Sequence, residues 1–349
     1  MEKENDMYVK QIIIITLAML TIACKEKTEH KMEYQISYTV TTTAPEEYPI
    51  EVHIGYLLDQ NKNLICGMPK VGTEQSGWEY DGSAGGQGGS VIPHHLNLTY
   101  VAYAEKKFYE VDAPLPADKI EAAFKKGYDH EEYNGDIVHN SYEYFTVGAA
   151  PGGVIVVWLS GTFNRIEICR LQAKEVVVSP DDFYDNPHQH TQEQFFDRLF
   201  EITVSDSIKA DIASKGIPYG RWEKYRERFK YRFVMQPYDE KDHFTLNYYT
   251  YFNGELDELL QKELNKHAYY DKAAPYKCKF IFTKYSTEII FNDQEMFEIF
   301  GMFKKKYPNK PIDVIIKPTF NYDSMEVFVK CEEKKIALKN YKVRGVWGG

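Results

Sequence analysis

The chain of 349 residues is poor in cysteine and carries no excess of positive charge. Its five cysteines include no Cys-x-x-Cys pair, which excludes zinc ribbons and thioredoxin-type redox motifs. The 42 Lys and Arg residues against 52 Asp and Glu give a net charge of −10, which argues against nucleic acid as a partner. No internal repeat indicates a solenoid or a propeller. The composition is that of a folded, acidic protein, and its 15% of aromatic residues are enough to build more than one hydrophobic core.

The motifs of several enzyme classes are also missing. The sequence has no G-x-S-x-G, no H-E-x-x-H and no G-x-x-x-x-G-K-[ST]. The glycine-rich stretch 81–90 is therefore interpreted as a flexible or tightly turned connector ahead of Pro93, and not as a phosphate-binding loop. We expect no catalytic residues and no cofactor.

No apolar run is long enough to span a bilayer. The run from Ile12 to Ala23 has twelve residues, whereas a membrane-spanning helix needs about 20. Lys10 precedes this run and Cys24 follows it, which predicts a lipoprotein signal peptide over residues 1–23 with Cys24 as the lipid attachment site. The acidic residues 1–6 leave open whether translation starts at Met1 or Met7. The polar residues 24–32 are expected to tether the folded part to the membrane lipid.

Four further cysteines leave the redox state open. They allow three disulfide pairings in an oxidising compartment, or they are small buried apolar residues. These cysteines are Cys66, Cys169, Cys278 and Cys331.

Residues 33–180 are predicted to be a mainly antiparallel, sandwich-like β domain. Alternating apolar residues in 34–40 and 50–56 indicate half-buried strands, and the continuous apolar run 154–159 indicates a central strand covered on both faces. One helix is expected over 118–128. A bridging segment, 181–215, follows with a loop and two helices, the first opened by the capping-box spacing of Thr191 and Gln194.

Residues 216–349 are predicted to be a separate α+β domain. The order of expected elements is strand 244–252, helix 255–267, strands 279–283 and 288–291, a helix capped by Asn292, and strand 312–316. This βαββαβ order is that of a ferredoxin-like domain. The fold class is therefore α+β.

Two histidines near an aspartate form the strongest metal-like group. Asp185, His188 and His190 lie on a polar loop, and two imidazoles one residue apart can share a metal ion. His94 and His95 are a second, weaker pair. A polar loop containing histidine is the simpler interpretation, so the leading prediction is no metal, and a metal-dependent hydrolase is kept as the alternative.

The segment 221–233 interleaves basic and aromatic residues. One interpretation is a binding surface that grips a polyanion or stacks on sugar rings, with Arg226, Arg228, Lys230 and Arg232 on one face of a strand. The other, which we favour, is an amphipathic helix turning into a strand, with its aromatic side chains buried and its arginines paired to acids elsewhere.

Three segments resemble a known family. Residues 96–124, with Leu96-Asn97-Leu98-Thr99-Tyr100, Ala104-Glu105-Lys106-Lys107-Phe108-Tyr109 and Leu115-Pro116-Ala117-Asp118-Lys119-Ile120, are similar to the core motif of the domain of unknown function 2931 family. Residues 148–158 resemble its second motif, and Trp222-x-x-Tyr225-Arg226-x-Arg228 resembles a third. Tyr100 stands where the family often has Trp. The resemblance implies a Gram-negative lipoprotein, of which some relatives neutralise antibacterial effectors, and it implies no catalytic residues.

The sequence thus predicts a lipoprotein of the cell envelope, anchored in the outer membrane, with its periplasmic or surface face left open. It is expected to bind a protein or an envelope component without catalysis. The alternative from another class is an extracytoplasmic hydrolase that uses the loop of Asp185, His188 and His190.

Overall fold

The computed structural model describes residues 36–132, 134–184 and 186–348, and the chain from Ile36 onward forms one compact unit. Strands account for 45% of the residues and helices for 20%, which confirms the α+β class. The predicted signal peptide, Cys24, the tether 24–32 and Asp185 lie outside the described residues. The predicted domain boundaries near residues 180 and 216 stay predictions.

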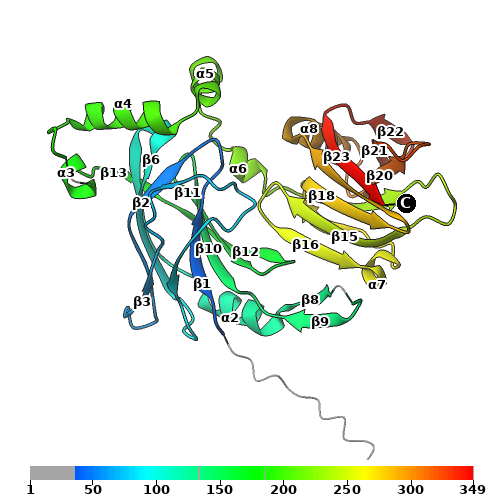
Figure 1. Cartoon of the computed structure of the whole chain (residues 1–349), viewed down its shortest axis with the longest axis horizontal. Coiled ribbons are helices and arrows are strands. Elements are labelled where there is room, and N and C mark those ends of the chain that lie inside the picture. Colours follow the sequence, from blue (N-terminus) through cyan, green and yellow to red (C-terminus); the bar gives the residue numbers. More distant parts are fainter. Residues whose placement is uncertain (1–35, 133, 185, 349) are drawn as a thin grey trace, which may run out of the picture. The chain divides into compact units, whose positions relative to one another are not determined.

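One large sheet of ten strands runs through most of this unit (Figure 1). In spatial order its strands are β23 (Tyr341–Gly348), β19 (Tyr285–Phe291), β18 (Pro275–Phe282), β15 (Phe244–Tyr251), β16 (Leu256–Leu260), β12 (Arg165–Gln172), β11 (Val154–Ser160), β10 (Tyr144–Ala150), β1 (Thr39–Thr43) and β5 (Ser83–Gln87). A single residue pair, Arg165 with Leu256, joins β12 to β16.

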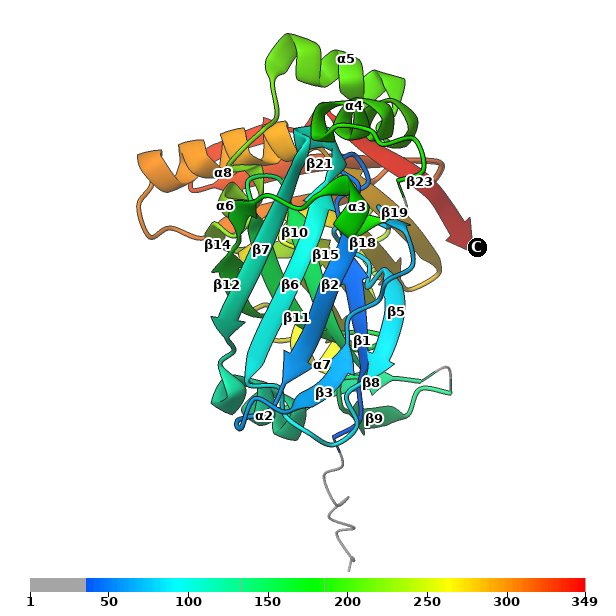
Figure 2. The ribbon, with the colours of Figure 1, turned by 90° about the vertical axis from the view of Figure 1, so that its left-hand side faces the viewer.

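A second sheet packs on strands β1, β10, β11 and β12 of the first sheet. Figure 2 looks onto strands β7, β6, β2 and β3 of this second sheet. Its order is β13 (Lys174–Val176), β7 (Lys107–Pro114), β6 (His95–Ala102), β2 (Ile50–Leu58) and β3 (Leu64–Gly67), with β4 (Thr73–Glu74) paired to β2. Side chains of both sheets, such as Val157 and Leu98, share one core.

Strand β11 confirms the prediction of a central strand covered on both faces. All seven of its residues are buried. Ile155, Val157 and Leu159 enter the core between the two sheets, whereas Val154, Val156 and Trp158 enter a second core on the opposite face. The period-2 alternation of a strand therefore places apolar side chains in two different cores.

The C-terminal part has a third sheet and its own core. The strands are β17 (Tyr270–Ala273), β14 (Arg228–Met235), β20 (Ile312–Pro318), β21 (Met325–Cys331) and β22 (Lys334–Ala337). Helix α8 (Asp293–Lys306) packs Met296, Phe300 and Phe303 into that core. As expected, the side chain of Asn292 caps this helix by accepting a hydrogen bond from the Glu295 amide.

The other helices are short. The helix predicted over 118–128 is α2 (Ala117–Lys126), which ends before Gly127. The predicted capping box of Thr191 and Gln194 opens α4 (Gln192–Thr203). The remaining elements are η1 (Tyr103–Glu105), β8 (Tyr128–Glu131), β9 (Ile137–Asn140), α3 (Pro180–Phe183), α5 (Asp206–Lys215), α6 (Arg221–Lys224) and α7 (Gln261–Leu264).

The helix predicted over 255–267 is wrong. Residues 256–260 form strand β16, and only the single turn α7 is helical. The cause is the tight turn at Asn253 and Gly254, where Gly254 has a φ of 84° and the chain reverses to pair β16 with β15. Because the first helix of the βαββαβ order is missing, the ferredoxin-like arrangement is not what forms.

The glycine-rich stretch 81–90 is not a connector either. Residues 83–87 form β5, which pairs with β1. A Cβ atom on Gly85 would lie 2.6 Å from the Pro69 nitrogen, and one on Gly86 would lie 2.6 Å from the Gly67 carbonyl oxygen. These glycines allow close approach of two backbones rather than a turn.

Candidate binding cleft

The basic and aromatic segment 221–233 folds as the favoured interpretation predicts. It forms the short helix α6, a turn, and the start of strand β14. Trp222 and Phe229 are each 3% exposed and lie in two different cores. The alternation of β14 places Arg228, Lys230 and Arg232 on the opposite face from Phe229 and Tyr231. The aromatic side chains therefore belong to the cores, and the cations face outward.

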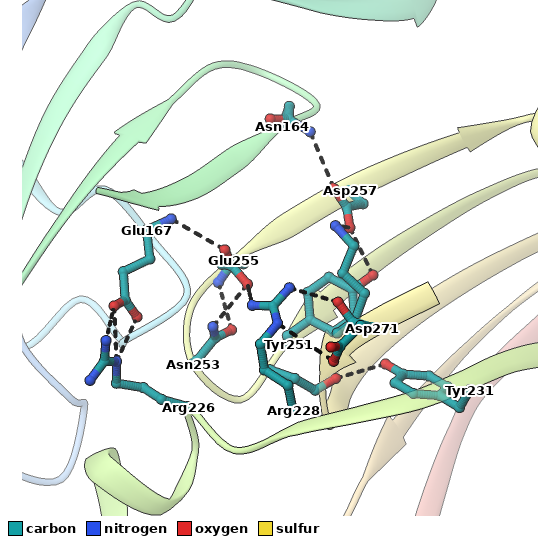
Figure 3. Close-up of polar contacts among 12 residues, drawn as sticks. Asn164, Glu167, Arg226, Arg228, Tyr231, Tyr251, Asn253, Glu255, Asp257 and Asp271 are labelled. Atoms are coloured by element: carbon teal, nitrogen blue, oxygen red, sulfur yellow. Dashed lines mark hydrogen bonds and ion pairs between the residues drawn. The ribbon is translucent and has the colours of Figure 1, made fainter. Parts of the chain in front are cut away.

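Arg226 holds the turn between α6 and β14 against strand β12. Its Nε donates to both carboxylate oxygens of Glu167, at 2.9 and 3.1 Å, and its Nη2 lies 2.6 Å from Glu167 Oε1. Glu167 is 12% exposed in its side chain and Arg226 is 34% exposed. Figure 3 shows the two groups face to face. This half-buried pair links residues 59 apart in sequence.

Arg228 makes a second link, to the turn before β16. Its Nη1 lies 3.2 Å from Glu255 Oε2, and its Nη2 donates to the Asp271 carbonyl oxygen at 2.8 Å (Figure 3). Glu255 also accepts from the Asn253 side-chain amide at 2.9 Å and from the Glu167 amide at 3.3 Å. The two arginines and two glutamates thus form one connected polar network.

Three of the four predicted cations share the outer face of β14, and the fourth, Arg226, precedes this strand. Arg232 pairs with Asp313 at 2.8 Å and lies 4.3 Å from the Tyr269 ring centre. Lys230 is exposed between Arg228 and Arg232. Only Arg226 and Arg228 line the cleft described next.

These two arginines open onto a polar cleft of about 540 Å³, which we call the charged cleft. Seven of its eight lining residues are charged, three positively and four negatively. The lining residues are Lys119, Glu167, Glu223, Arg226, Glu227, Arg228, Asn253 and Glu255. At its edge, Lys119 Nζ donates to the Glu167 carbonyl oxygen at 3.1 Å. The cleft presents fixed charges of both signs, suited to a ligand with complementary charges.

A thiol lies next to these charged groups. The pKa of Cys169 is raised to about 11, chiefly by burial, although the charges of Lys119 and Arg226 act in the opposite direction. The thiol is therefore protonated at neutral pH and is a poor nucleophile. Cys169 is therefore not an activated nucleophile beside the cleft.

The predicted metal-like loop is described only in part. The rings of His188 and His190 lie with their centres 5.6 Å apart, and Asp185 is outside the described residues. In the part of the chain that the structure describes, no group of three or more His, Cys, Asp and Glu side chains is placed to hold a metal ion. His95, from the second predicted pair, contacts Asp112.

The sequence pattern identified the two arginines but missed their partners. Glu167 belongs to an alternating strand and Glu255 to a turn, and neither position stands out from other surface acids. The one usable signal was the Asn253-Gly254 dipeptide, which predicts a hairpin and would have placed Glu255 beside it.

The redox state that the sequence left open is answered for the four described cysteines. Cys66, Cys169, Cys278 and Cys331 form no disulfide, and all except Cys169 are buried. In addition, no helix within the described ranges combines the length and the apolar character needed to cross a bilayer.

Comparison with known proteins gives one match. The model of the family described as "Protein of unknown function (DUF2931)" matches residues 24–220. The chain belongs to this family. No curated protein and no solved structure matches the chain. In the charged cleft, Lys119 and Glu167 come from the DUF2931 region, and the other six residues lie beyond it.

Proposed function

We propose that this DUF2931 protein is an exported lipoprotein, anchored through Cys24 in the outer membrane, that binds a protein or envelope component without catalysis. The apolar run 12–23 and the cysteine after it support export and lipid attachment. The family match begins at Cys24, the first residue expected after cleavage. The resemblance to Gram-negative lipoproteins supports the same location.

The charged cleft is the observation that supports a binding role. Its arginines are held by carboxylates in a fixed geometry, which lowers the entropy lost when a ligand binds. Glu223 and Glu227 at its edge are 53% and 38% exposed in their side chains, and they pair with Arg226 and Lys304, so a partner that binds them competes with exposed ion pairs of low cost. Charges arranged in this way contribute specificity and a fast association rate.

The test is cross-linking of the full chain in native membranes, followed by affinity capture and mass spectrometry. The cleft variant is Glu223→Lys with Glu227→Lys, because exposed ion pairs contribute little to stability. The control is Glu240→Lys with Glu333→Lys, two exposed acids outside the cleft with the same change of charge. A partner that the wild type and control capture, and the cleft variant loses at unchanged Tm, supports the proposal. Equal capture by all three removes the cleft from consideration.

The hydrolase alternative has a separate test. His190 Nδ1 is buried without a hydrogen-bond partner among the described residues, which is the state of a nitrogen available to a metal. Zinc retained stoichiometrically through dialysis, and lost in His188→Ala with His190→Ala, would favour the metal-dependent hydrolase. Absence of retained zinc leaves the binding role as the better proposal.

A further inference from the structure

A second cavity lies in the C-terminal part and shares no residue with the charged cleft. It has a volume of about 250 Å³ and is bounded by strands β14, β15, β16 and β17 and by the turn around α7. Its apolar and aromatic lining includes Phe233, Tyr249, Tyr251, Leu259, Leu264 and Tyr270. An apolar cavity of about 150 Å³ holds one benzene molecule, so this one has room for a single ring with a short side chain.

The cations in the lining are already neutralised. Lys272 Nζ lies 2.5 Å from Asp257, and Asp257 also accepts a hydrogen bond from the Tyr251 hydroxyl at 2.9 Å. Arg232 pairs with Asp313 outside the cavity. Neither cation is therefore available to an anionic ligand without breaking an existing pair.

One carboxylate is left without a full set of partners. Glu263 lines the cavity with a side chain that is 25% exposed, and its Oε2 atom is buried with no hydrogen-bond partner among the described residues. Its Oε1 lies 3.9 Å from the Lys262 ammonium. A buried carboxylate oxygen without a donor is costly, and a donor supplied by a ligand would remove that cost.

The aromatic lining favours the same kind of ligand. The rings of Phe233 and Tyr249 lie with their centres 4.6 Å apart at the wall of the cavity. The faces of such rings attract cations and stack on other rings. Glu263 and these two rings line the same cavity, which thus offers a carboxylate and aromatic faces, both of which attract an ammonium group.

We propose that this cavity binds a small organic amine with an apolar body of about one ring, its ammonium group donating to Glu263 and its body lying against Phe233 and Tyr249. This site is independent of the charged cleft, so either proposal can fail alone.

The test is isothermal titration calorimetry of the full chain with three probes of similar shape. These are phenethylamine, 2-phenylethanol and 3-phenylpropionate, which are positive, neutral and negative at pH 7. The amine is expected to bind at least about tenfold more tightly than the alcohol, and the carboxylate more weakly than both. Equal affinities for the three probes, or no binding of the amine at millimolar concentration, would overturn the proposal.

Two variants locate the effect. Glu263→Gln keeps the shape of the side chain, and we expect it to bring the amine to the affinity of the alcohol while alcohol binding stays unchanged. Glu333→Gln, an exposed acid outside the cavity, is the matched control and keeps the preference for the amine. Ala268→Phe fills the cavity and should abolish binding of both probes. If Glu263→Gln retains the full preference for the amine, Glu263 is not the recognition group and the proposal fails.

Discussion

The guanidinium of Arg165 lies over the indole of Trp158, with its carbon 4.2 Å from the ring centre. Arg165 is 2% exposed, and burial lowers its pKa to about 10. It donates to the Trp78 carbonyl oxygen at 3.1 Å, while its Nε and Nη2 have no hydrogen-bond partner among the described residues. The nearest acid, Asp81, is 3.6 Å from its Nε. Packing on the indole and the charge of Asp81 thus accompany a single hydrogen bond in holding this cation in the protein interior.

This packing predicts that two substitutions of Arg165 lower the free energy of unfolding by different amounts. Arg165→Ala should lower the free energy of unfolding by about 3 kcal/mol, because it leaves a cavity over Trp158. Arg165→Met should recover most of that loss, since it fills the space and removes two unpartnered donors. Urea denaturation of both variants measures the difference. A methionine variant as unstable as the alanine variant would show that the charge itself is required.

The pair of Arg226 and Glu167 predicts a measurable coupling energy. We expect a double-mutant cycle with Arg226→Gln and Glu167→Gln to give about 1–2 kcal/mol, because the pair is half-buried and joined by several charged hydrogen bonds. The matched control is Lys317 with Glu326, whose side chains are 41% and 48% exposed, and for which we expect less than about 0.5 kcal/mol. Equal couplings in the two cycles would contradict a structural role for the first pair.

Glu258 predicts a pH dependence of stability. Burial raises the pKa of its carboxyl from 4.5 to about 7, outweighing the hydrogen bond from the Glu131 amide. The folded protein therefore binds more protons than the unfolded chain between about pH 4.5 and 7. The stability contributed by this proton is complete below pH 4.5 and is lost as the pH rises through 7.

The substitution Glu258→Gln removes this titration. We expect its free energy of unfolding to be close to that of the wild type at pH 4.5 and to exceed it at pH 8. Urea denaturation of both proteins at the two pH values gives the difference between variant and wild type at each pH, and taking this difference cancels the titration of the groups that they share. A difference between variant and wild type that does not change with pH would refute the raised pKa.

Trp222 predicts a large loss of stability on truncation. Its ring is 3% exposed and meets the rings of Tyr48 and Trp78, with centres 5.4 and 6.4 Å away. Trp222→Ala should cost about 3–5 kcal/mol, whereas Phe320→Ala, at a ring 70% exposed, should cost less than about 1 kcal/mol. Thermal unfolding measures both. A small effect at Trp222 would mean that the ring is available for binding instead of packing.

Cys24 predicts the mode of membrane attachment. Cys24→Ala should abolish metabolic labelling with palmitate, because the thiol is the expected acceptor of the lipid. Membrane fractionation of the same cells should show release of the protein if the lipid is its anchor. A variant that stays in the membrane with an unlabelled, uncleaved N-terminus would indicate that residues 1–23 themselves act as the anchor.

Local signals predicted much of this fold because their physical causes are local. The capping side chain of Asn292 and the capping box at Thr191 satisfy amides within three residues, so sequence spacing is sufficient to locate them. The continuous apolar run in β11 was also informative, since only a strand buried on both faces tolerates it.

The errors arise where the pairing of strands decides the local structure. The leucines of 256–264 fit a helical stripe, but the turn at Gly254 and pairing with β15 impose a strand, so tertiary context overrides periodicity. In the charged cleft, the arginines were visible as an unusual composition. Their partners were not, because Glu167 and Arg226 meet only after the strands have paired.

The free thiols of Cys66, Cys169, Cys278 and Cys331 have a consequence for how this protein can be made and handled. No disulfide joins the described residues, which are held together by packing, hydrogen bonds and ion pairs. A reductant therefore has no bond to break among these residues, so the protein can be purified with its four thiols kept reduced.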